Sequence, residues 1–329
     1  MTLSTADPAG TGGSIDTSGR PPAVRVRDLV KRYRNTEHNA VDGVSFEVPE
    51  GELFCLLGPN GAGKTTIVSI LTTTLNATSG EVRVAGHDLT RPHLVRRNVG
   101  IVFQEPSLDM NLTAEENIRL HAILYGLYPW RPSWRLMPAD YRTQVRELGE
   151  ILGLDGQLSR RVRTLSGGTR RKLEIIRALL HRPRVLFLDE PTAGLDPRSR
   201  HDLWAYLRQV RHRHGTTVLL TTHYLEEAEA ANTVCVLARG RVIEYGSPAA
   251  IKDRHTRPEL VLDARDRAGL RRELLALGLT VADGEPLRVR VDPSGAQRVV
   301  RALRTELTHL QMVQPTLEQT YLLLLERAR

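Results

Sequence analysis

The chain has 329 residues, 40% of them hydrophobic, so it can bury the core of one large domain or of a large and a small one. No apolar run reaches the ~18 residues that span a bilayer, and the start of the chain predicts no secretory signal. The formal net charge is +8, but the basic residues are scattered and nearly all Arg. A basic surface could serve nucleic acid, anionic lipid or solubility alone, and the scattered charges leave solubility as open as the other two together. We expect no nucleic-acid partner.

Ordered patterns begin at about residue 23, after a tail at 1–22 whose Gly, Ser, Thr, Pro and Asp content predicts disorder. Strands are predicted from apolar or alternating runs at 23–33, 41–58, 81–86, 99–104, 185–189, 216–223 and 231–246. Helices are predicted at 65–75, 113–126, 141–153, 168–181 and 202–215. The unbroken apolar runs at 185–189 and 216–223 are typical of parallel strands buried on both faces.

The two cysteines, Cys55 and Cys235, lie inside predicted strands. Their apolar neighbours predict buried, reduced thiols rather than a disulfide. This state suits the cytosol.

A second unit without any chemical motif follows, and residues 256–329 are predicted as a small α/β domain. Its predicted strands are at 259–264, 278–284 and 286–292, and its predicted helices at 267–278, at 294–307 and in the last segment. Leu287 and Val289 alternate with charged residues, which predicts one buried face. Thr316 and Gln319 have the spacing of a capping box at the start of the final helix.

A glycine-rich loop precedes the helix predicted at 65–75. Residues 58–66 read GPNGAGKTT and fit the phosphate-binding pattern G-x-x-x-x-G-K-[ST]. In such a loop, backbone N–H groups at a helix N-terminus point at a bound anion. Lys64 is predicted to contact the β- and γ-phosphates, the Thr65 hydroxyl to bind Mg²⁺, and Thr66 to support the phosphate contacts. The predicted nucleotide-binding residues of the loop are Gly58, Pro59, Asn60, Gly61, Ala62, Gly63, Lys64, Thr65 and Thr66.

A chance match to this pattern is disfavoured, because a strand is predicted before the loop and a helix after it. A dinucleotide fingerprint is disfavoured as well. It would need a third glycine three residues beyond Gly63, and the chain has Thr66 there.

Two adjacent carboxylates end the apolar run at 185–189. Asp189 and Glu190 should emerge at the carboxyl edge of the sheet, where ligands bind in folds of this class. We predict that Asp189 holds Mg²⁺ and that Glu190 polarises the attacking water. The alternative is a strand that ends in two solvated acids, which is disfavoured in a chain that also has a phosphate loop.

A second predicted anion site opens the helix at 168–181. Residues 165–168 read LSGG, and Ser166, Gly167 and Gly168 form a helix start suited to an anion. One chain cannot readily place both anion sites on the same γ-phosphate. Two chains facing head to tail can do so.

Between about residues 24 and 250 the chain resembles the ATP-binding subunits of ABC transporters. The motifs of that family occur in order, as a phosphate loop at 58–66, a Q-loop glutamine at Gln104, a signature at 165–168, a metal-and-base pair at Asp189 and Glu190, a D-loop aspartate at Asp196 and a switch histidine at His223. Tyr33 stands where the family has an adenine-stacking aromatic. The resemblance implies an α/β fold, a P-loop NTPase core with a mixed sheet and a helical subdomain at about 108–180. The ABC domain would cover 23–252.

The resemblance also implies roles for residues outside the loop. His223 would contact the γ-phosphate and hold Glu190 and the water. Gln104 would touch the Mg²⁺ and water site and report the nucleotide state to a membrane partner, while Asp196 would link two active sites across a dimer. Taken singly, Tyr33 would more often be a strand aromatic in a core, and Gln104 and His223 could be polar strand ends.

Two features depart from the family pattern. Thr169 stands where the signature most often continues with Gln, although Ser166 and Gly168 are intact. The segment 125–141 looks longer than usual and contains two Trp and three Pro. A membrane-subunit contact and a locally packed insertion both remain open for that segment.

Within the family, the stretches QEPSLD, RRVRTLSGGTRRKLE, HYLEEAE and PTLEQTYLLLL resemble drug-exporting subunits of the daunorubicin-resistance type. This implies an ATP hydrolase that uses ATP and Mg²⁺ at the cytoplasmic face of a bacterial membrane. It would work as a homodimer, or paired with a similar ATPase, and power export of a drug-like or hydrophobic compound through a separate transmembrane permease. The alternatives are an ATPase for uptake or for lipid or glycan export, and a soluble ABC factor. The sequence does not identify the permease or the substrate.

Overall fold

The structure, a computed structural model, describes residues 21–34, 36–105, 107–154, 156–282 and 284–328. Of the predicted tail at 1–22, residues 1–20 lie outside the described part. No helix among the described residues combines the length and the apolar character needed to cross a membrane.

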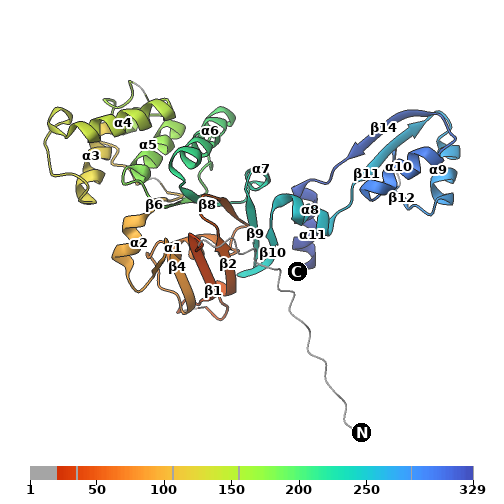
Figure 1. The fold of residues 1–329 in the computed structure, drawn as a ribbon, viewed down its shortest axis with the longest axis horizontal. Coiled ribbons are helices and arrows are strands. Elements are labelled where there is room, and N and C mark those ends of the chain that lie inside the picture. Colours follow the sequence, from red (N-terminus) through yellow and green to blue (C-terminus); the bar gives the residue numbers. More distant parts are fainter. Residues whose placement is uncertain (1–20, 35, 106, 155, 283, 329) are drawn as a thin grey trace, which may run out of the picture.

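The strands form three sheets (Figure 1). An antiparallel sheet has the order β2-β1-β4-β5, with β1 (Val24–Lys31), β2 (Val41–Val48), β4 (Ser79–Val84) and β5 (His87–Asp88). The central sheet has the order β10-β9-β3-β8-β7-β6, with β3 (Leu53–Leu57), β6 (Val99–Val102), β7 (Val185–Asp189), β8 (Thr217–Thr222), β9 (Thr233–Ala238) and β10 (Arg241–Gly246). The third sheet has the order β12-β13-β11-β14, with β11 (Glu259–Ala264), β12 (Val281–Ala282), β13 (Leu287–Arg290) and β14 (Leu307–Val313).

The helices of the first part of the chain are α1 (Lys64–Leu71), α2 (Pro92–Asn98), α3 (Ala114–Leu124), α4 (Ala139–Leu152), α5 (Gly167–Leu179), α6 (Pro197–His214), α7 (Leu225–Glu229) and α8 (Pro248–His255). Those of the last part are α9 (Arg267–Ala276), α10 (Pro293–Ala302) and α11 (Leu317–Arg327). Helices α3, α4 and α5 form the helical subdomain beside the central sheet (Figure 1).

The inner strands β3, β7 and β8 of the central sheet are buried on both faces, as the apolar runs at 185–189 and 216–223 predict. All five residues of β3 are buried, and so are all five of β7. Alternate residues belong to different cores: Phe54 and Phe187 pack in the cluster around α1 and the antiparallel sheet, whereas Cys55 and Leu186 pack in the cluster that includes the helical subdomain. Cys55 and Cys235 are buried free thiols, as predicted.

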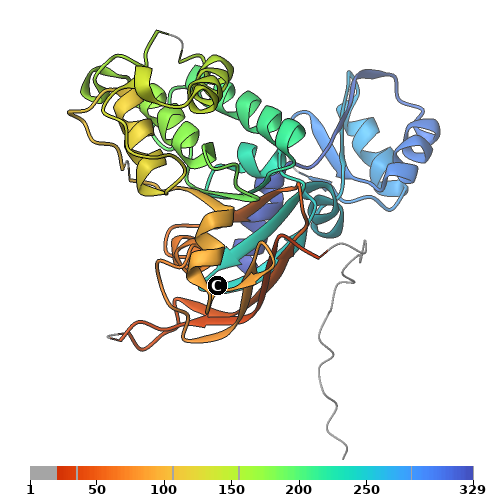
Figure 2. The ribbon, with the colours of Figure 1, turned by 60° about the vertical axis from the view of Figure 1, so that its left-hand side comes forward.

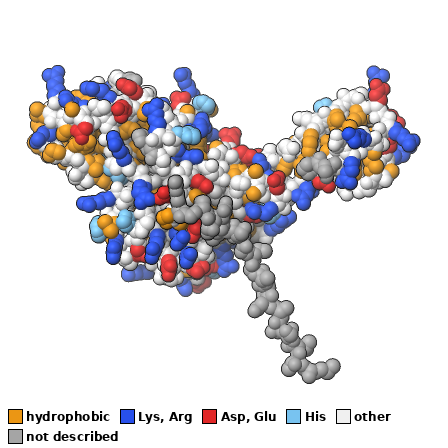
Figure 3. All heavy atoms as spheres, in the orientation of Figure 1, with side chains coloured by type: hydrophobic (Ala, Val, Ile, Leu, Met, Phe, Trp, Pro, Cys, Tyr) orange, Lys and Arg blue, Asp and Glu red, His pale blue; other side chains and the backbone are white. Residues whose placement is uncertain are grey.

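Part of the 125–141 segment packs locally. The rings of Tyr128 and Trp134 both pack edge-on against buried Tyr141, with centroids 5.3 and 5.6 Å away. Trp130 is 67% exposed, and the exposed apolar residues of this subdomain also include Leu124 and Leu136. Apolar side chains are visible over this end of the molecule in Figure 3.

The residues after α8 do not form one cluster. Strands β11–β14 with α9 and α10 enclose a core of their own, and this unit lies apart from the helical subdomain in both views (Figures 1 and 2). The last helix, α11, packs elsewhere: Leu317, Tyr321 and Leu324 belong to the core of the ATPase part. The capping box of Thr316 and Gln319 is present at its start, as predicted.

One predicted helix of this unit was too long, and the strand after it was missed. Residues 294–307 were predicted as one helix, but α10 ends at Ala302 and β14 begins at Leu307. The turn between them is stabilised by Glu273 of α9, which accepts hydrogen bonds from the backbone N–H groups of Arg304 and Thr305 at 2.9 and 3.2 Å. This contact comes from a distant part of the sequence, so helical spacing alone could not reveal the break.

We expect Leu317→Ala to lower the free energy of unfolding by about 2–5 kcal/mol, since Leu317 is 2% exposed in the ATPase core. The matched control on the same helix is Leu322→Ala, because Leu322 is 54% exposed. Its effect should stay within about 0.5 kcal/mol. Urea unfolding of both variants measures the difference, and equal effects would contradict the packing of α11 on the core.

His121 of α3 should make stability depend on pH. Burial lowers the pKa of His121 to about 3, with Arg177 and His181 adding repulsion, and its ring lies 4.1 Å from that of Tyr125. An unfolded histidine titrates near pH 6.5, so between about 6.5 and 3 only the unfolded chain binds the proton. This contribution to stability is complete above about pH 6.5 and is lost as the pH falls.

His121→Phe should therefore flatten the loss of unfolding free energy between about pH 7 and pH 5, with about pH 8 as the baseline at which both states are neutral. Urea unfolding across that range checks it. A variant whose stability falls as steeply as that of the wild type would show that His121 does not carry the effect.

Candidate functional site

The phosphate loop joins β3 to α1 and needs glycine at its last turn. Gly63 has φ +104°, in the region that side chains rarely adopt, and a Cβ there would meet the Ala40 carbonyl oxygen at 2.6 Å. Gly63 is also the N-cap of α1, which therefore begins at Lys64. Gly63 offers no side-chain cap to the first turn of α1, whose N–H groups point out of the helix end.

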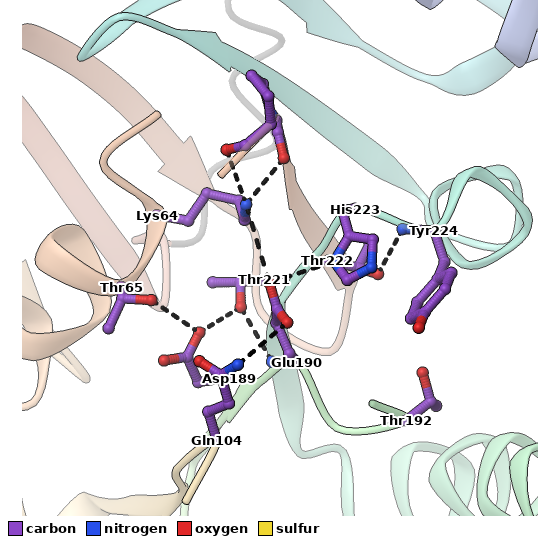
Figure 4. A network of polar contacts seen from close by, with 12 residues as sticks. Lys64, Thr65, Gln104, Asp189, Glu190, Thr192, Thr221, Thr222, His223 and Tyr224 are labelled. Carbon is purple, nitrogen blue, oxygen red and sulfur yellow. Dashed lines mark hydrogen bonds and ion pairs between the residues drawn. The ribbon is translucent and has the colours of Figure 1, made fainter. Parts of the chain in front are cut away.

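Lys64 is held under the loop. Its side chain is buried, and its Nζ donates to the carbonyl oxygens of Gly58 and Pro59 at 2.8 and 3.1 Å (Figure 4). Nζ also lies 3.9 Å from Oε1 of Glu190. Burial lowers the pKa of Lys64, while Glu190 and Asp189 oppose that shift. The ammonium thus lies between the loop carbonyls and the Glu190 carboxylate.

Asp189 ends β7 and meets the phosphate loop. Its Oδ1 accepts a hydrogen bond from Thr65 Oγ1 at 3.4 Å and a short one from Thr221 Oγ1 (Figure 4). The in-register parallel pairing of β7 with β8 sets Asp189 opposite Thr221. The predicted pair of Thr65 and Asp189 therefore lies together.

Glu190 lies one residue beyond the strand, in a strained backbone conformation with φ +45°. Its N–H donates to the Thr221 carbonyl oxygen at 3.2 Å and to Thr221 Oγ1 at 3.0 Å. These two bonds hold the backbone of Glu190 against Thr221 near the end of β8. Glu190 therefore does not continue the extended backbone of β7.

Three predicted residues converge on the Glu190 carboxylate. Gln104 Nε2 donates to Oε2 at 3.4 Å, and His223 Nδ1 lies 3.3 Å from Oε1 (Figure 4). With Lys64, these groups reach Glu190 from three separate segments of the chain. The structure thus brings together Lys64, Gln104, Glu190 and His223, which are far apart in sequence.

Tyr33 lies at the other end of the loop. It is 42% exposed, and its hydroxyl lies 3.3 Å from Oγ1 of Thr66. An exposed ring anchored to the loop suits stacking with a base. The alternative of a core aromatic does not fit this exposure.

The signature lies at the start of α5 in the helical subdomain. Its residues are not among those labelled in the polar network around Glu190 (Figure 4). Ser166 is exposed and caps α5 by accepting from the N–H of Thr169 at 3.2 Å. The hydroxyl of Thr169, the departure from the family pattern, lies 2.7 Å from that of Ser166. Gly168 is buried, and a Cβ there would meet Ser199 Oγ at 2.6 Å.

Asp196 caps α6 in the D-loop region. Its carboxylate accepts from the N–H and the hydroxyl of Ser199 at 2.9 and 2.6 Å, and these bonds lower the pKa of Asp196. The cap explains why α6 begins at Pro197, before the predicted start at 202.

Sequence reasoning missed two residues that hold the site, Thr221 and Arg171. Thr221 lies in a run of apolar residues and threonines, and only its register opposite Asp189 gives it a function. Arg171 looks like one of many arginines, yet its buried guanidinium donates to the carbonyl oxygens of Asp189 and Pro191. One feature of the sequence could have indicated Thr221. It stands two residues before the predicted site residue His223, on the predicted parallel strand at 216–223.

A cavity of about 880 Å³ borders the phosphate loop at Gly61 and is lined by the β9–β10 turn and the loop after β1. Its lining contains none of Lys64, Asp189 and Glu190. The polar network around Glu190, and not this cavity, is therefore the candidate site.

Known proteins resemble the chain in sequence. Residues 41–193 match the family described as ABC transporter. The daunorubicin/doxorubicin resistance ATP-binding protein of Streptomyces peucetius is 40% identical over 310 residues, which cover 91% of this chain and 90% of that protein. A Nod factor export ATP-binding protein of Paraburkholderia xenovorans is 41% identical over 233 residues, or 70% of this chain and 73% of that one.

Solved structures share the fold. An ATP-binding subunit of an ABC transporter has a TM-score of 0.61 at 30% identity, covering 70% of this chain and 92% of that one. A dimeric ATP-binding cassette in a post-hydrolysis state with ADP and Pi has a TM-score of 0.60 at 28% identity, covering 68% and 98%.

Fold and site together define an ABC-type nucleotide-binding ATP hydrolase. The chain belongs to the ATP-binding proteins of the ABC transporter family. The match with the Streptomyces resistance protein reaches beyond the ATPase core into the C-terminal unit, because it covers 91% of the chain. The predicted fold class, family and enzyme activity are confirmed.

We expect Thr221→Val to reduce ATP hydrolysis and to lower the free energy of unfolding by about 1–3 kcal/mol, because it removes the hydroxyl shared by Asp189 and the Glu190 N–H while keeping the shape. Thr221→Ser keeps the hydroxyl and is the control. Steady-state ATPase rates and urea unfolding compare the two. A Val variant as active as the Ser variant would exclude this role.

Proposed function

We propose that this protein is the ATP-binding and ATP-hydrolysing subunit that powers export of a drug-like or hydrophobic compound through a separate transmembrane permease. The observation that carries the catalytic part is the convergence of Lys64, Gln104 and His223 on the Glu190 carboxylate. Resistance and export ATP-binding proteins among the relatives support the transport part.

The residues at the end of β7 fit a magnesium ion. The Thr65 hydroxyl and the Asp189 carboxylate are hard oxygen donors whose atoms lie 3.4 Å apart. Among the described residues no group of three or more His, Cys, Asp or Glu side chains could hold a metal. One carboxylate and one hydroxyl suit Mg²⁺, which binds through few protein ligands plus phosphates and waters. Thr65 and Asp189, with Gln104, would hold the ion, which would neutralise phosphate charge.

Each protein group then has a role in hydrolysis. The N–H groups of the phosphate loop and Lys64 bind the phosphates, and the exposed ring of Tyr33 stacks on the base. Glu190 accepts the proton of the attacking water. His223 and Gln104, which already contact both Glu190 oxygens, orient the carboxylate and the water. Lys64 stabilises negative charge that develops on the transferred phosphoryl group.

The signature acts on the nucleotide of a second copy, or of a similar ATPase. Ser166 is exposed at the N-terminus of α5, where its hydroxyl and the free N–H groups suit the γ-phosphate of that partner. A dimeric cassette among the similar structures supports this arrangement. Asp196 would link the two sites. Closure of the pair on ATP and opening after hydrolysis would move a permease at the cytoplasmic face of a bacterial membrane.

Glu190→Gln should retain ATP binding but reduce hydrolysis at least about 100-fold, since the amide cannot accept the proton of the water. The variant should accumulate as an ATP-dependent dimer in size-exclusion chromatography. Lys64→Ala is the contrasting control, because it should lose ATP binding and the dimer. Normal turnover by Glu190→Gln would overturn the assignment.

The transport function is tested by pulling down the tagged chain from detergent-solubilised native membranes. Recovery of a multi-spanning subunit at comparable stoichiometry, identified by mass spectrometry, is the expected result. Recovery with ribosomes, with nucleic acid or with nothing would reject it.

A further inference from the structure

One face of α5 carries three charged residues that follow the signature in sequence and contact the ATPase core. Arg171, Glu174 and Arg177 are spaced three residues apart, so they lie along one side of the helix. Arg171 is 7% exposed and Glu174 is 3% exposed. Buried charges are retained where they are fully paired, so their partners show what this face does.

Arg171 bonds the backbone on both sides of Glu190, which carries the proposed catalytic carboxylate. Its Nη2 donates to the carbonyl oxygen of Asp189 and its Nε to that of Pro191, both at 2.9 Å. These carbonyls belong to the residues immediately before and after Glu190. The guanidinium therefore fixes both sides of the strained residue that bears the predicted base.

The same guanidinium holds the segment of Gln104. Nη1 of Arg171 donates to the carbonyl oxygen of Phe103, the residue before Gln104, and to Oε2 of Glu174 at 3.1 Å. Glu174 in turn accepts from the backbone N–H of Ser107 at 2.8 Å. The two segments that meet at the Glu190 carboxylate are thus tied to one helix.

Arg177 provides a natural comparison. It donates to the carbonyl oxygen of Ser107 at 2.8 Å and to the Ser107 hydroxyl, so it holds the segment after Gln104. Within the described part of the chain, its guanidinium makes no hydrogen bond to residues 189–191. Arg171 and Arg177 therefore share a helix and a charge but differ in whether they touch the backbone around Glu190.

Stability alone does not account for a buried guanidinium. A well-packed apolar side chain of similar volume is often as stabilising as a buried ion pair, because desolvation offsets the attraction. What arginine adds is a rigid fork of donors that satisfies several acceptors at set angles. Here four acceptors from three segments are satisfied at once.

We propose that Arg171 is a positioning residue for ATP hydrolysis, which sets Glu190 and Gln104 relative to each other and to the helix that begins with the signature. The inference rests on the proposed roles of Glu190 and Gln104. Arg171 therefore connects two sites. Its helix begins at Ser166, which would touch the partner's nucleotide, and its guanidinium bonds the backbone on both sides of Glu190, the base of this chain's own site. Arg171 lies outside the phosphate-binding residues, so its loss should affect the chemical step and spare ATP binding.

The test compares Arg171→Met, Arg171→Lys and Arg177→Met in the full chain. Arg171→Met should lower kcat about 30- to 100-fold, as expected for a base displaced by an ångström, with the KM and the Kd for ATP within about threefold of the wild type. Arg171→Lys should lose about tenfold, because a single ammonium cannot reach both carbonyls that flank Glu190. Arg177→Met should stay within about fivefold of wild-type kcat, because it leaves those carbonyls bonded.

Thermal unfolding and fluorescent-nucleotide binding correct each rate for the folded, binding-competent fraction. A purely structural role would lower the melting temperature and leave the corrected kcat of Arg171→Met at the wild-type value, which would overturn the proposal. Equal losses in Arg171→Met and Arg177→Met would also overturn it. If Arg171→Met does not fold, Arg171→Lys takes its place. A corrected kcat of Arg171→Lys equal to that of the wild type would then overturn the proposal.

Glu190→Gln separates this inference from the proposed function. An inactive Glu190→Gln with a fully active Arg171→Met rejects only the role of Arg171. An active Glu190→Gln rejects the assignment of the base on which both depend.

Discussion

The in-register pairing of β7 with β8 is the constraint on which the site depends. It places Thr221 opposite Asp189. The Thr221 hydroxyl then bonds the Asp189 carboxylate, and the N–H of Glu190 donates to the same hydroxyl oxygen and to the Thr221 carbonyl oxygen. A slip of one residue would turn every side chain of β7 to the other face and exchange the two cores. Since β7 is buried on both faces by different clusters, such a slip would mispack both. Core packing therefore fixes the position of the Asp189 and Glu190 carboxylates.

The charges of the site are likewise held in place by the fold. Lys64 is desolvated, but its ammonium is bonded to two carbonyl oxygens and lies near Glu190. These contacts set the position of the ammonium relative to the Glu190 carboxylate. These contacts distinguish the network from two solvated acids at a strand end, the alternative that the sequence disfavoured for Asp189 and Glu190.

The parts of the site that could be predicted are those formed by residues adjacent in the sequence. The phosphate loop, the paired carboxylates and the helix start at Ser166 are local patterns whose chemistry depends on spacing, and the family resemblance added Gln104 and His223. Thr221 and Arg171 could not be found this way, because each acquires its partners from strands or segments distant in sequence. The same limit accounts for the missed strand β14, whose preceding turn is stabilised by Glu273 of another helix. Amphipathic spacing predicted α11 as a helix but could not say which core its leucines join.

The pairing of Glu259 with Val313 means that the C-terminal unit leaves and rejoins the ATPase part at neighbouring points. Its first and last strands, β11 and β14, lie side by side, while α11 beyond them is part of the main core. In topology the unit is an insertion in a surface loop rather than an appendage at the end of the chain. Domain insertion is tolerated where the two ends of the inserted unit lie close together at the surface. Any unit at this position has to return the chain to the start of α11, because Leu317, Tyr321 and Leu324 belong to the main core.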